Sequence, residues 1–561
     1  MRNALHTRFP LGVLALIGLV GGCSSEPSGP DDPTPPATPA NVVASAVSNS
    51  SVQVVFDAVT GATGYQVQRA DGAAGTNFVT AGTVAAPPFT DTGLQTSATY
   101  RYQVAALSGT LSSAFSAPVS VTTQGTPVET ITQNITTNTV WTSDKEYLLQ
   151  GFIKVTNGAT LTIEAGTTIK GDFNTLGSSL FVLRGAKIQA LGTAANPIVF
   201  TSSRAPGQRQ AGDWGGLIIV GNGVINRGQP VILEGTGTGA KNPQVDYSGG
   251  TDNSDNSGIL RYVRIEFAGY ATAPDAELNT LTLAAVGGGT TIEYVQALNG
   301  LDDNFEWFGG AVDMKYIVSY NAGDDHFDAS EGYVGRNQFL IAYQQVAVVP
   351  RPSAGNVSSD PQGFENDGCA GSNCLSGQTS LPYTIPVFAN FTLVGPPAGV
   401  NEAGSGRVGM MLRRGTGGHY VNGVVARWGR AAISLRDQTT LDRIASNDLQ
   451  LSNLLLAENG TIFQPASGST VQGTVDLAAN NIEDNAATAA SLFAGLPAAP
   501  TTASLDWTPS ATSPARTGGL AVFTGLLATR SGGAVTGTSY RGAADPNGAK
   551  WWQGWTSYAT N

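Results

Sequence analysis

The chain has 561 residues, enough for two to four domains at ~100–200 residues each. Only 12% of the residues are charged and 71 are glycine, which indicates many turns and short strands and excludes a helical bundle or coiled coil. Lys and Arg number 29 against 41 Asp and Glu, a net charge of −12. This balance argues against nucleic-acid binding, because phosphate contacts need clustered cations.

The N-terminus has the pattern of an export signal. Two arginines precede an apolar run over residues 11–20, which is too short for a transmembrane span. The run leads into Gly21-Gly22-Cys23, and this segment resembles the lipobox of bacterial lipoproteins. The resemblance implies a signal peptide at 1–22 and a diacylglycerol on Cys23, with ordinary secretion as the alternative. Ser24 stands where inner-membrane lipoproteins commonly have Asp, so we expect a lipid anchor in the outer membrane or cell surface.

Two further N-terminal regions follow Cys23. Residues 23–38 are rich in proline and predict an extended tether. Residues 39–125 alternate apolar and polar side chains at a period of two, as half-buried strands do. This stretch resembles a fibronectin type III module, with Phe56 in place of the usual core Trp and with Leu94 and Tyr100 matching its tyrosine corner. The resemblance implies a β-sandwich spacer. We expect strands at Val52–Phe56, Tyr65–Arg69, Tyr100–Val104 and Val119–Val121.

The remaining residues, 126–561, contain an internal repeat. LDDNFE at 301–306 aligns with GDDHFD at 323–328, an offset of 22 residues, and Tyr294 and Tyr316 have the same offset. A period near 22 with three short strands per unit is typical of a parallel β-helix, whose stacked coils share a continuous apolar core. A propeller needs twice this period, and a leucine-rich repeat needs a Leu/Asn signature.

Several segments of this region are similar to a widespread family of exported bacterial β-helix proteins. They include GDWGGLIIVGNGVIN, GILRYVRIEFAG and the closing YRGAADPNGAKWWQGWTSYA. The resemblance implies a fold and an exported location without implying a chemistry. We therefore expect an all-β chain, a fibronectin type III-like sandwich followed by a right-handed parallel β-helix at 126–561. Segments at about 350–381 and at 485–515 are expected to break the coil period. Inward columns of like residues should place Phe305 on Phe327.

Acidic residues recur on neighbouring coils of the predicted β-helix. Equivalent positions would lie ~4.8 Å apart, and like charges at that distance disfavour joint ionisation. Three arrangements would relieve the repulsion: capping of turn N–H groups, a bound Ca²⁺, which prefers carboxylate oxygens, or a shared proton. The candidate metal ligands are Asp302, Asp303, Glu306, Asp324, Asp325 and Asp328.

Many polysaccharide lyases and glycosidases are parallel β-helices, so catalysis is a further hypothesis, although a fold does not imply a function. An inverting hydrolase uses two carboxyl groups, and a lyase needs a base. Trp307 and Phe308 are candidates for stacking on sugar rings, with capping of a coil corner as the alternative. The candidate catalytic residues are Asp302, Glu306, Asp328 and His326.

Cys369 and Cys374 lie in a loop-like segment rich in Gly, Ser and Asn. Because an exported chain meets an oxidising compartment, we expect a disulfide between them. A metal pair is the alternative, but no further Cys or nearby His completes such a site.

Together these patterns favour a cell-surface lipoprotein that acts as a binding or structural protein rather than an enzyme. Extracellular polysaccharide or a surface protein is the candidate partner, besides outer-membrane lipid. The alternatives are a carbohydrate-active enzyme, either a polysaccharide lyase or a glycoside hydrolase, and an adhesin. The sequence contains no phosphate-binding glycine loop and no G-x-S-x-G elbow. Ca²⁺ is the one cofactor considered.

Overall fold

The computed structural model describes residues 34–561 except 275, 359–360, 370, 372, 401–406 and 467–470. Cys23 and the predicted signal peptide lie outside the described residues. The chain divides into two compact units, Met1–Thr126 and Pro127–Asn561. Within the described ranges, no helix combines the length and apolarity that crossing a membrane requires.

The first unit is a β-sandwich, as predicted. A three-stranded sheet has the order β1-β2-β5, and a second sheet has the order β4-β3-β6-β7 with β8 paired to β6. All four predicted strands are confirmed, and Phe56 is buried in the core between the sheets. The tyrosine corner is also confirmed, because the Tyr100 hydroxyl accepts a hydrogen bond from the Gln95 N–H at 2.8 Å. The strands are β1 (Val43–Ala46), β2 (Ser51–Val55), β3 (Gly64–Asp71), β4 (Val79–Val84), β5 (Phe89–Thr92), β6 (Thr99–Ser108), β7 (Leu111–Ser112) and β8 (Val119–Thr122).

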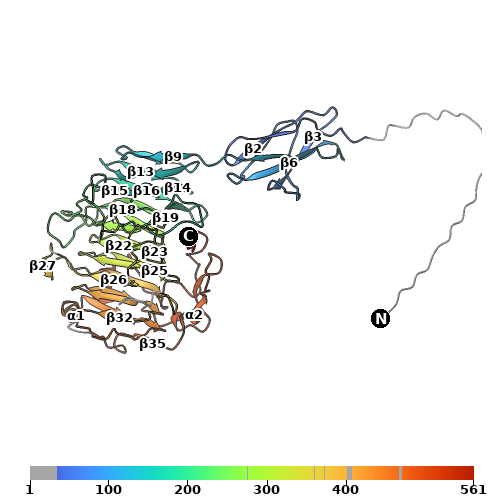
Figure 1. Ribbon diagram of the computed structural model, residues 1–561. Helices are drawn as coiled ribbons and strands as arrows, with labels where there is room; N and C mark the ends of the chain where they lie inside the picture. The colour runs from blue at the N-terminus through green and yellow to red at the C-terminus, as the bar shows by residue number, and fades with distance from the viewer. Residues whose placement is uncertain are drawn as a thin grey trace, which may run out of the picture. The chain divides into compact units, whose positions relative to one another are not determined.

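The second unit is a parallel β-helix, in which successive coils stack from β9 to β35 (Figure 1). One wall is a nine-stranded parallel sheet, and its inward side chains form a continuous apolar core. The predicted offset of 22 residues is the register between β22 and β24, since Phe305 pairs with Phe327, and their ring centroids lie 5.5 Å apart. In order, the sheet contains β12 (Phe152–Val155), β15 (Ser179–Val182), β18 (Gly216–Val220), β20 (Leu281–Ala284), β22 (Phe305–Phe308), β24 (Phe327–Ser330), β26 (Phe364–Asp367), β29 (Val408–Arg413) and β32 (Ala431–Leu435).

The other walls form a 17-stranded sheet whose long strands bend at single residues of positive φ. Tyr294 and Tyr316 occupy this bend with φ of 56° and 61°, and their rings stack at 4.5 Å. The strands are β9 (Val128–Ile131), β10 (Thr139–Trp141), β11 (Glu146–Leu149), β13 (Thr160–Ile163), β14 (Thr168–Gly171), β16 (Lys187–Leu191), β17 (Ile198–Ser202), β19 (Gly258–Glu266), β21 (Thr291–Leu298), β23 (Asp313–Tyr320), β25 (Arg336–Tyr343), β28 (Val387–Val394), β30 (Gly418–Val421), β31 (Val424–Ala426), β33 (Leu449–Ser452), β34 (Leu455–Ala457) and β35 (Glu483–Asn485).

The C-terminal segment, residues 515–561, returns along this sheet, so that the C-terminus lies beside β19 (Figure 1). Side-chain amides of the coils bind its backbone reciprocally. Gln296 donates to the Ser557 carbonyl at 2.6 Å and accepts from the Ser557 N–H at 2.7 Å, and Gln338 binds Thr536 in the same way. The short elements are β27 (Leu375–Gln378), β36 (Phe493–Gly495), β37 (Asp506–Pro509), α1 (Gln438–Ala445), α2 (Ala489–Leu492), η1 (Pro514–Arg516) and α3 (Gly525–Ser531).

The structure differs in one respect from the predicted insertion at about 350–381. Its residues 364–367 form β26, which pairs in register with β24 and β29 and is therefore a regular part of the wall. The extra length lies on either side of this strand. The expected disulfide is present on the C-terminal side, between Cys369 and Cys374.

Candidate functional site

Three carboxylates form an outward-facing column on the nine-stranded sheet. Glu306 of β22 pairs with Asp328 of β24, and Asp328 pairs with Glu365 of β26. The phenylalanine before each acid points into the core, so strand alternation directs the acid to the outer face. Adjacent members of the column are therefore about one coil spacing apart, ~4.8 Å.

The turn before each strand supplies a second set of acids, and here side chains cap the backbone of the next coil. Asn279 Oδ1 accepts from the Asp303 N–H at 3.2 Å, and Asp303 Oδ1 accepts from the Asp325 N–H at 2.8 Å. Asp325 Oδ1 accepts from the Gln362 N–H at 2.6 Å, and the Gln362 side chain accepts from the Val408 N–H at 3.0 Å. Turn capping, one of the three predicted means of relief, is thus confirmed for Asp303 and Asp325.

The neighbouring acids line a cleft of about 520 Å³, within the usual size range of ligand pockets. Glu277, Asp302 and Asp324 face it, and residues 271–274 and 353–358 supply the rest of its wall. Carboxylate oxygens of Asp302, Asp303 and Asp324 lie within 4.8 Å of one another.

A second group of carboxylates continues the first. Oxygens of Asp303, Asp325 and Asp328 also lie within 4.8 Å of one another, so Asp303 joins the two groups. Glu306 is in neither group, and its carboxylate accepts a hydrogen bond from the Asn279 side chain. Five of the six predicted metal ligands are therefore brought together.

Burial and mutual repulsion raise the pKa values of these carboxyl groups, which favours their protonated forms. Burial is the first cause of the raised pKa of Asp302, Asp303 and Asp328, and neighbouring carboxylates are the next. Burial also raises the pKa of Glu365 to about 7, against the opposing effect of Arg413. The column thus contains carboxyl groups that remain partly protonated near neutral pH.

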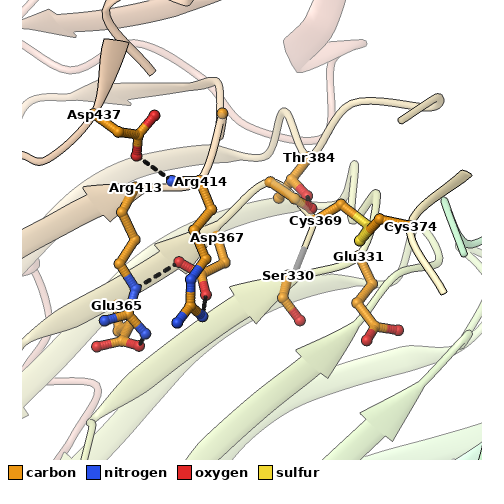
Figure 2. A network of polar contacts seen from close by, with 12 residues as sticks. Ser330, Glu331, Glu365, Asp367, Cys369, Cys374, Thr384, Arg413, Arg414 and Asp437 are labelled. Atoms are coloured by element: carbon orange, nitrogen blue, oxygen red, sulfur yellow. Dashed lines mark hydrogen bonds and ion pairs between the residues drawn. A yellow bond between two sulfur atoms is a disulfide. The ribbon is translucent and has the colours of Figure 1, made fainter. Parts of the chain in front are cut away.

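Two arginines compensate one end of the column (Figure 2). Arg413 pairs with Glu365 and, through Nε at 2.8 Å, with Asp367, and Arg414 pairs with Asp367 at 2.5 Å. Asp437 accepts a hydrogen bond from the backbone N–H of Arg414 and so fixes this turn. In the described part of the chain, no lysine or arginine forms an ion pair with Glu306 or Asp328, the other two members of the column, or with Asp302, Asp303 and Asp325 in the turns beside it.

The prediction that Trp307 and Phe308 stack on sugar rings is wrong. Trp307 is fully buried in the core, with its ring 5.4 Å from that of Tyr333, because it shares the inward face with Phe305. Phe308 faces outward but is covered by Tyr247, whose ring centroid lies 5.6 Å away. Neither ring offers a free face to a ligand.

The prediction of His326 as a catalytic base is also wrong. The side chain is fully buried, and its Nδ1 lies 2.6 Å from the Ser319 hydroxyl. Burial lowers its pKa to about 3, so the imidazole is neutral and enclosed by the core. The other catalytic candidates, Asp302, Glu306 and Asp328, lie at the acidic cleft or in the column beside it.

Glu277, Glu365 and Arg413 are members of the site that the sequence analysis missed. A signal for Glu365 exists, since a Phe–acid pair occurs at 305–306, at 327–328 and again at 364–365. The third pair falls 37 residues after the second rather than 22, so a strict period does not find it. Glu277 and Arg413 lie outside the acidic repeat and reach the site only through the coil stacking.

The chain belongs to the pectate-lyase-like β-helix family, whose domain model matches residues 133–510. No curated protein matches the chain. The solved structures similar to part of the chain include the FN5 domain of Drosophila Lar, at 27% identity over 16% of this chain and 98% of that chain, with a TM-score of 0.15. An Fn3-like protein from Clostridium thermocellum is 28% identical over 16% of this chain and 90% of that one, with a TM-score of 0.14. The chain spans only 32% of the chicken CNTN1 FN1–FN3 structure, at 18% identity over 16% of this chain and a TM-score of 0.15.

Glu365→Gln is expected to weaken the pH dependence of stability. Because the pKa of Glu365 is raised to about 7 by burial, the folded state keeps a proton that the unfolded state loses from pH ~4.5 upward. The contribution of this carboxyl group is complete below pH ~4.5 and is lost as the pH rises through about 7. Denaturant unfolding without divalent cations measures this at pH 4.5 and pH 8. Between these two pH values the free energy of unfolding should fall further for wild type than for the variant, by on the order of 2 kcal/mol. Glu129→Gln, at an exposed position, is the matched control. Equal pH dependence in wild type and Glu365→Gln would contradict the expectation.

Proposed function

We propose that this protein is a lipid-anchored surface protein that binds extracellular polysaccharide at the acidic cleft of its β-helix. The observation that carries the proposal is the convergence of Glu277, Asp302 and Asp324 on one cleft of about 520 Å³. Membership of a pectate-lyase-like family supports a role connected with polysaccharide. The described residues that line this cleft include no aromatic side chain, which favours recognition by polar groups over stacking.

Ca²⁺ fits the donor set of this cleft. Every candidate ligand is a carboxylate oxygen, the donor that a hard cation prefers, and the two groups that share Asp303 hold their oxygens within 4.8 Å. The residues that would hold the ion are Asp302, Asp303 and Asp324, with Asp325 and Asp328 beside them. A bound cation would supply positive charge to carboxylates and attract the hydroxyl or carboxylate oxygens of a glycan.

Glycoside hydrolysis is the second candidate function, and the raised pKa values favour it. Hydrolases of this kind need one protonated carboxyl group as the acid and one carboxylate as base or nucleophile. Burial and repulsion raise the pKa of Asp302 at the cleft and of Asp328 in the column beside it, which favours a protonated carboxyl group that can act as the acid. A protonated member of the cluster could then donate to a glycosidic oxygen while a neighbour stays ionised.

Chelation is expected to lower the melting temperature of the β-helix unit. A ligand that binds only the folded state adds RT ln(1 + [L]/Kd), about 2.7 kcal/mol at a hundredfold excess over Kd. Asp302→Asn and Asp324→Asn should lose stability relative to wild type only when calcium is present. Melting curves in EDTA and in millimolar calcium measure this, with Glu129→Gln as the control. A wild-type melting temperature that EDTA does not change would contradict the calcium proposal.

Glycan binding is expected to require the same two acids. The full chain should bind a subset of polysaccharides on an array in calcium, and Asp302→Asn and Asp324→Asn should each weaken that binding by about tenfold, whereas Glu129→Gln should not. A reducing-sugar assay on the bound glycans separates the two candidate functions, since release of ends indicates hydrolysis. Binding that both variants retain in full would place recognition elsewhere on the molecule.

The lipid anchor has its own test. Cys23→Ser is expected to move the protein from the membrane fraction to the soluble fraction and to abolish incorporation of labelled palmitate, because the thiol receives the diacylglyceryl group in the lipobox pattern. Fractionation and labelling of wild type and variant measure this. A variant that still pellets with the outer membrane and carries undiminished label would disprove the assignment.

A further inference from the structure

A second cleft, of about 510 Å³, uses the other end of the loop that walls the acidic cleft. Residues 346–349 line this second cleft, whereas residues 353–358 of the same loop line the acidic one. Two guanidinium groups, from Arg204 and Arg209, replace the carboxylates here. The whole chain has a net charge of −12, so a positively charged concave surface is unusual in it.

Arg204 is held in place by groups that leave donors available. Its Nη1 donates to the Gln210 side chain at 2.8 Å, and its guanidinium lies 5.5 Å from the centre of the Phe173 ring. The ion pair with Asp213 is longer, at 3.4 Å, and the Arg204 side chain is 25% exposed. A guanidinium has five N–H donors, so these contacts orient Arg204 without using all of them.

Arg209 is oriented in a similar way. Its Nε donates to the backbone carbonyl of Arg204 at 3.1 Å, and its Nη1 lies 3.5 Å from a Glu266 carboxylate oxygen. The side chain is 16% exposed. The arginine fork is therefore fixed before any ligand arrives, which reduces the entropy that binding would cost.

The nearby carboxylates are engaged mainly by other partners. Asp213 Oδ2 accepts from the Ser202 hydroxyl at 2.6 Å and from the Gln210 N–H at 3.0 Å. Glu266 accepts from Arg264 at 3.0 Å and from the Thr201 hydroxyl at 2.9 Å.

A further arginine adds to the local charge. Arg351 donates to the backbone carbonyl of Phe173 at 2.5 Å, and its guanidinium lies 5.5 Å from the centre of that ring. Four arginines thus surround two buried carboxylates, and positive charge is in excess around the cleft.

The rest of the wall is mainly apolar or carries amides, and Thr560 and Asn561 of the C-terminal segment complete it. Val346, Val348 and Val349 form one side, and the Val349 side chain is 67% exposed. Asn299 and Gln208 supply amide groups that can bind hydroxyls. This lining is complementary to a ligand that has an anionic group at one end and a carbon skeleton with hydroxyl groups.

From these contacts we propose that the cleft at Arg204 and Arg209 binds an oxyanion carried by a sugar-sized organic molecule. The guanidinium groups receive the carboxylate, sulfate or phosphate oxygens, and the valine side contacts the carbon skeleton. This site is independent of the acidic cleft and does not use calcium.

Calorimetric titration of the full chain tests the proposal after EDTA treatment and dialysis into buffer free of divalent cations and of chelator, because the carboxylates of EDTA would compete for the arginines. The probes are glucuronate, glucose 6-sulfate and glucose 6-phosphate, with glucose as the neutral control and sodium sulfate as the inorganic one. At least one sugar anion should bind more tightly than sulfate, and glucose should not bind. The anion that binds best identifies the head group.

Variants assign the binding to residues. Arg209→Gln and Arg204→Gln should each lower the affinity for the sugar anion by about tenfold or more. Arg209→Lys should bind the anion more tightly than Arg209→Gln but less tightly than wild type, because lysine lacks the paired donors of a guanidinium group. Val349→Ser, at an exposed position, should lower the affinity for the sugar anion but leave the affinity for sulfate unchanged. Lys241→Gln is the control for lost surface charge, and melting curves verify that each variant is folded.

Three results would overturn the proposal. The first is the absence of saturable binding of every sugar anion up to about 10 mM. The second is binding that remains unchanged in folded Arg209→Gln and Val349→Ser. The third is tighter binding of sulfate than of all sugar anions, which would reject the organic ligand. Failure of the acidic cleft to bind calcium or glycan would leave this result unaffected, so the two proposals stand or fall separately.

Discussion

In-register hydrogen bonding between parallel strands places each residue of one coil directly beside its counterpart in the next coil. This constraint acts equally on apolar and charged side chains. It puts Phe305 on Phe327 in the core, with ring centroids 5.5 Å apart, and it puts Glu306 beside Asp328 on the outer face. The aromatic column stabilises the stack through burial, whereas the acidic column opposes it through repulsion. The aromatic column and the acidic column both follow from the same strand register.

The larger unit tolerates the acidic column because the charge is dispersed by several means. Asp303 and Asp325 each accept a backbone N–H of the next coil, so part of the acidic repeat satisfies the turns. Arg413 pairs with Glu365 at one end of the column, and burial raises the pKa of Glu306 at the other end. A site that keeps protonated and ionised carboxyl groups side by side is suited to cation binding or to acid–base chemistry.

Loops, rather than the coils themselves, give the two clefts their different chemistry. The loop at 346–358 contributes valines to the arginine-lined cleft and small polar residues to the acidic one. Turns between coils can lengthen without disturbing the ladder, since β26 keeps its register with β24 although 37 residues separate their first positions. A regular scaffold therefore carries two sites of opposite charge on neighbouring surfaces.

The sequence by itself determined the fold class, the 22-residue register, the disulfide and the identity of most acids in the cleft. Those features arise from local patterns, namely strand alternation, a period shared by two adjacent coils, and two nearby cysteines. Tertiary structure alone decided that Tyr247 covers Phe308, that His326 is enclosed in the core, and that Glu277 and Arg413 join the site. The reason is physical: repeat spacing predicts neighbours along the stack, but burial and charge compensation depend on loops of irregular length that return from distant parts of the chain.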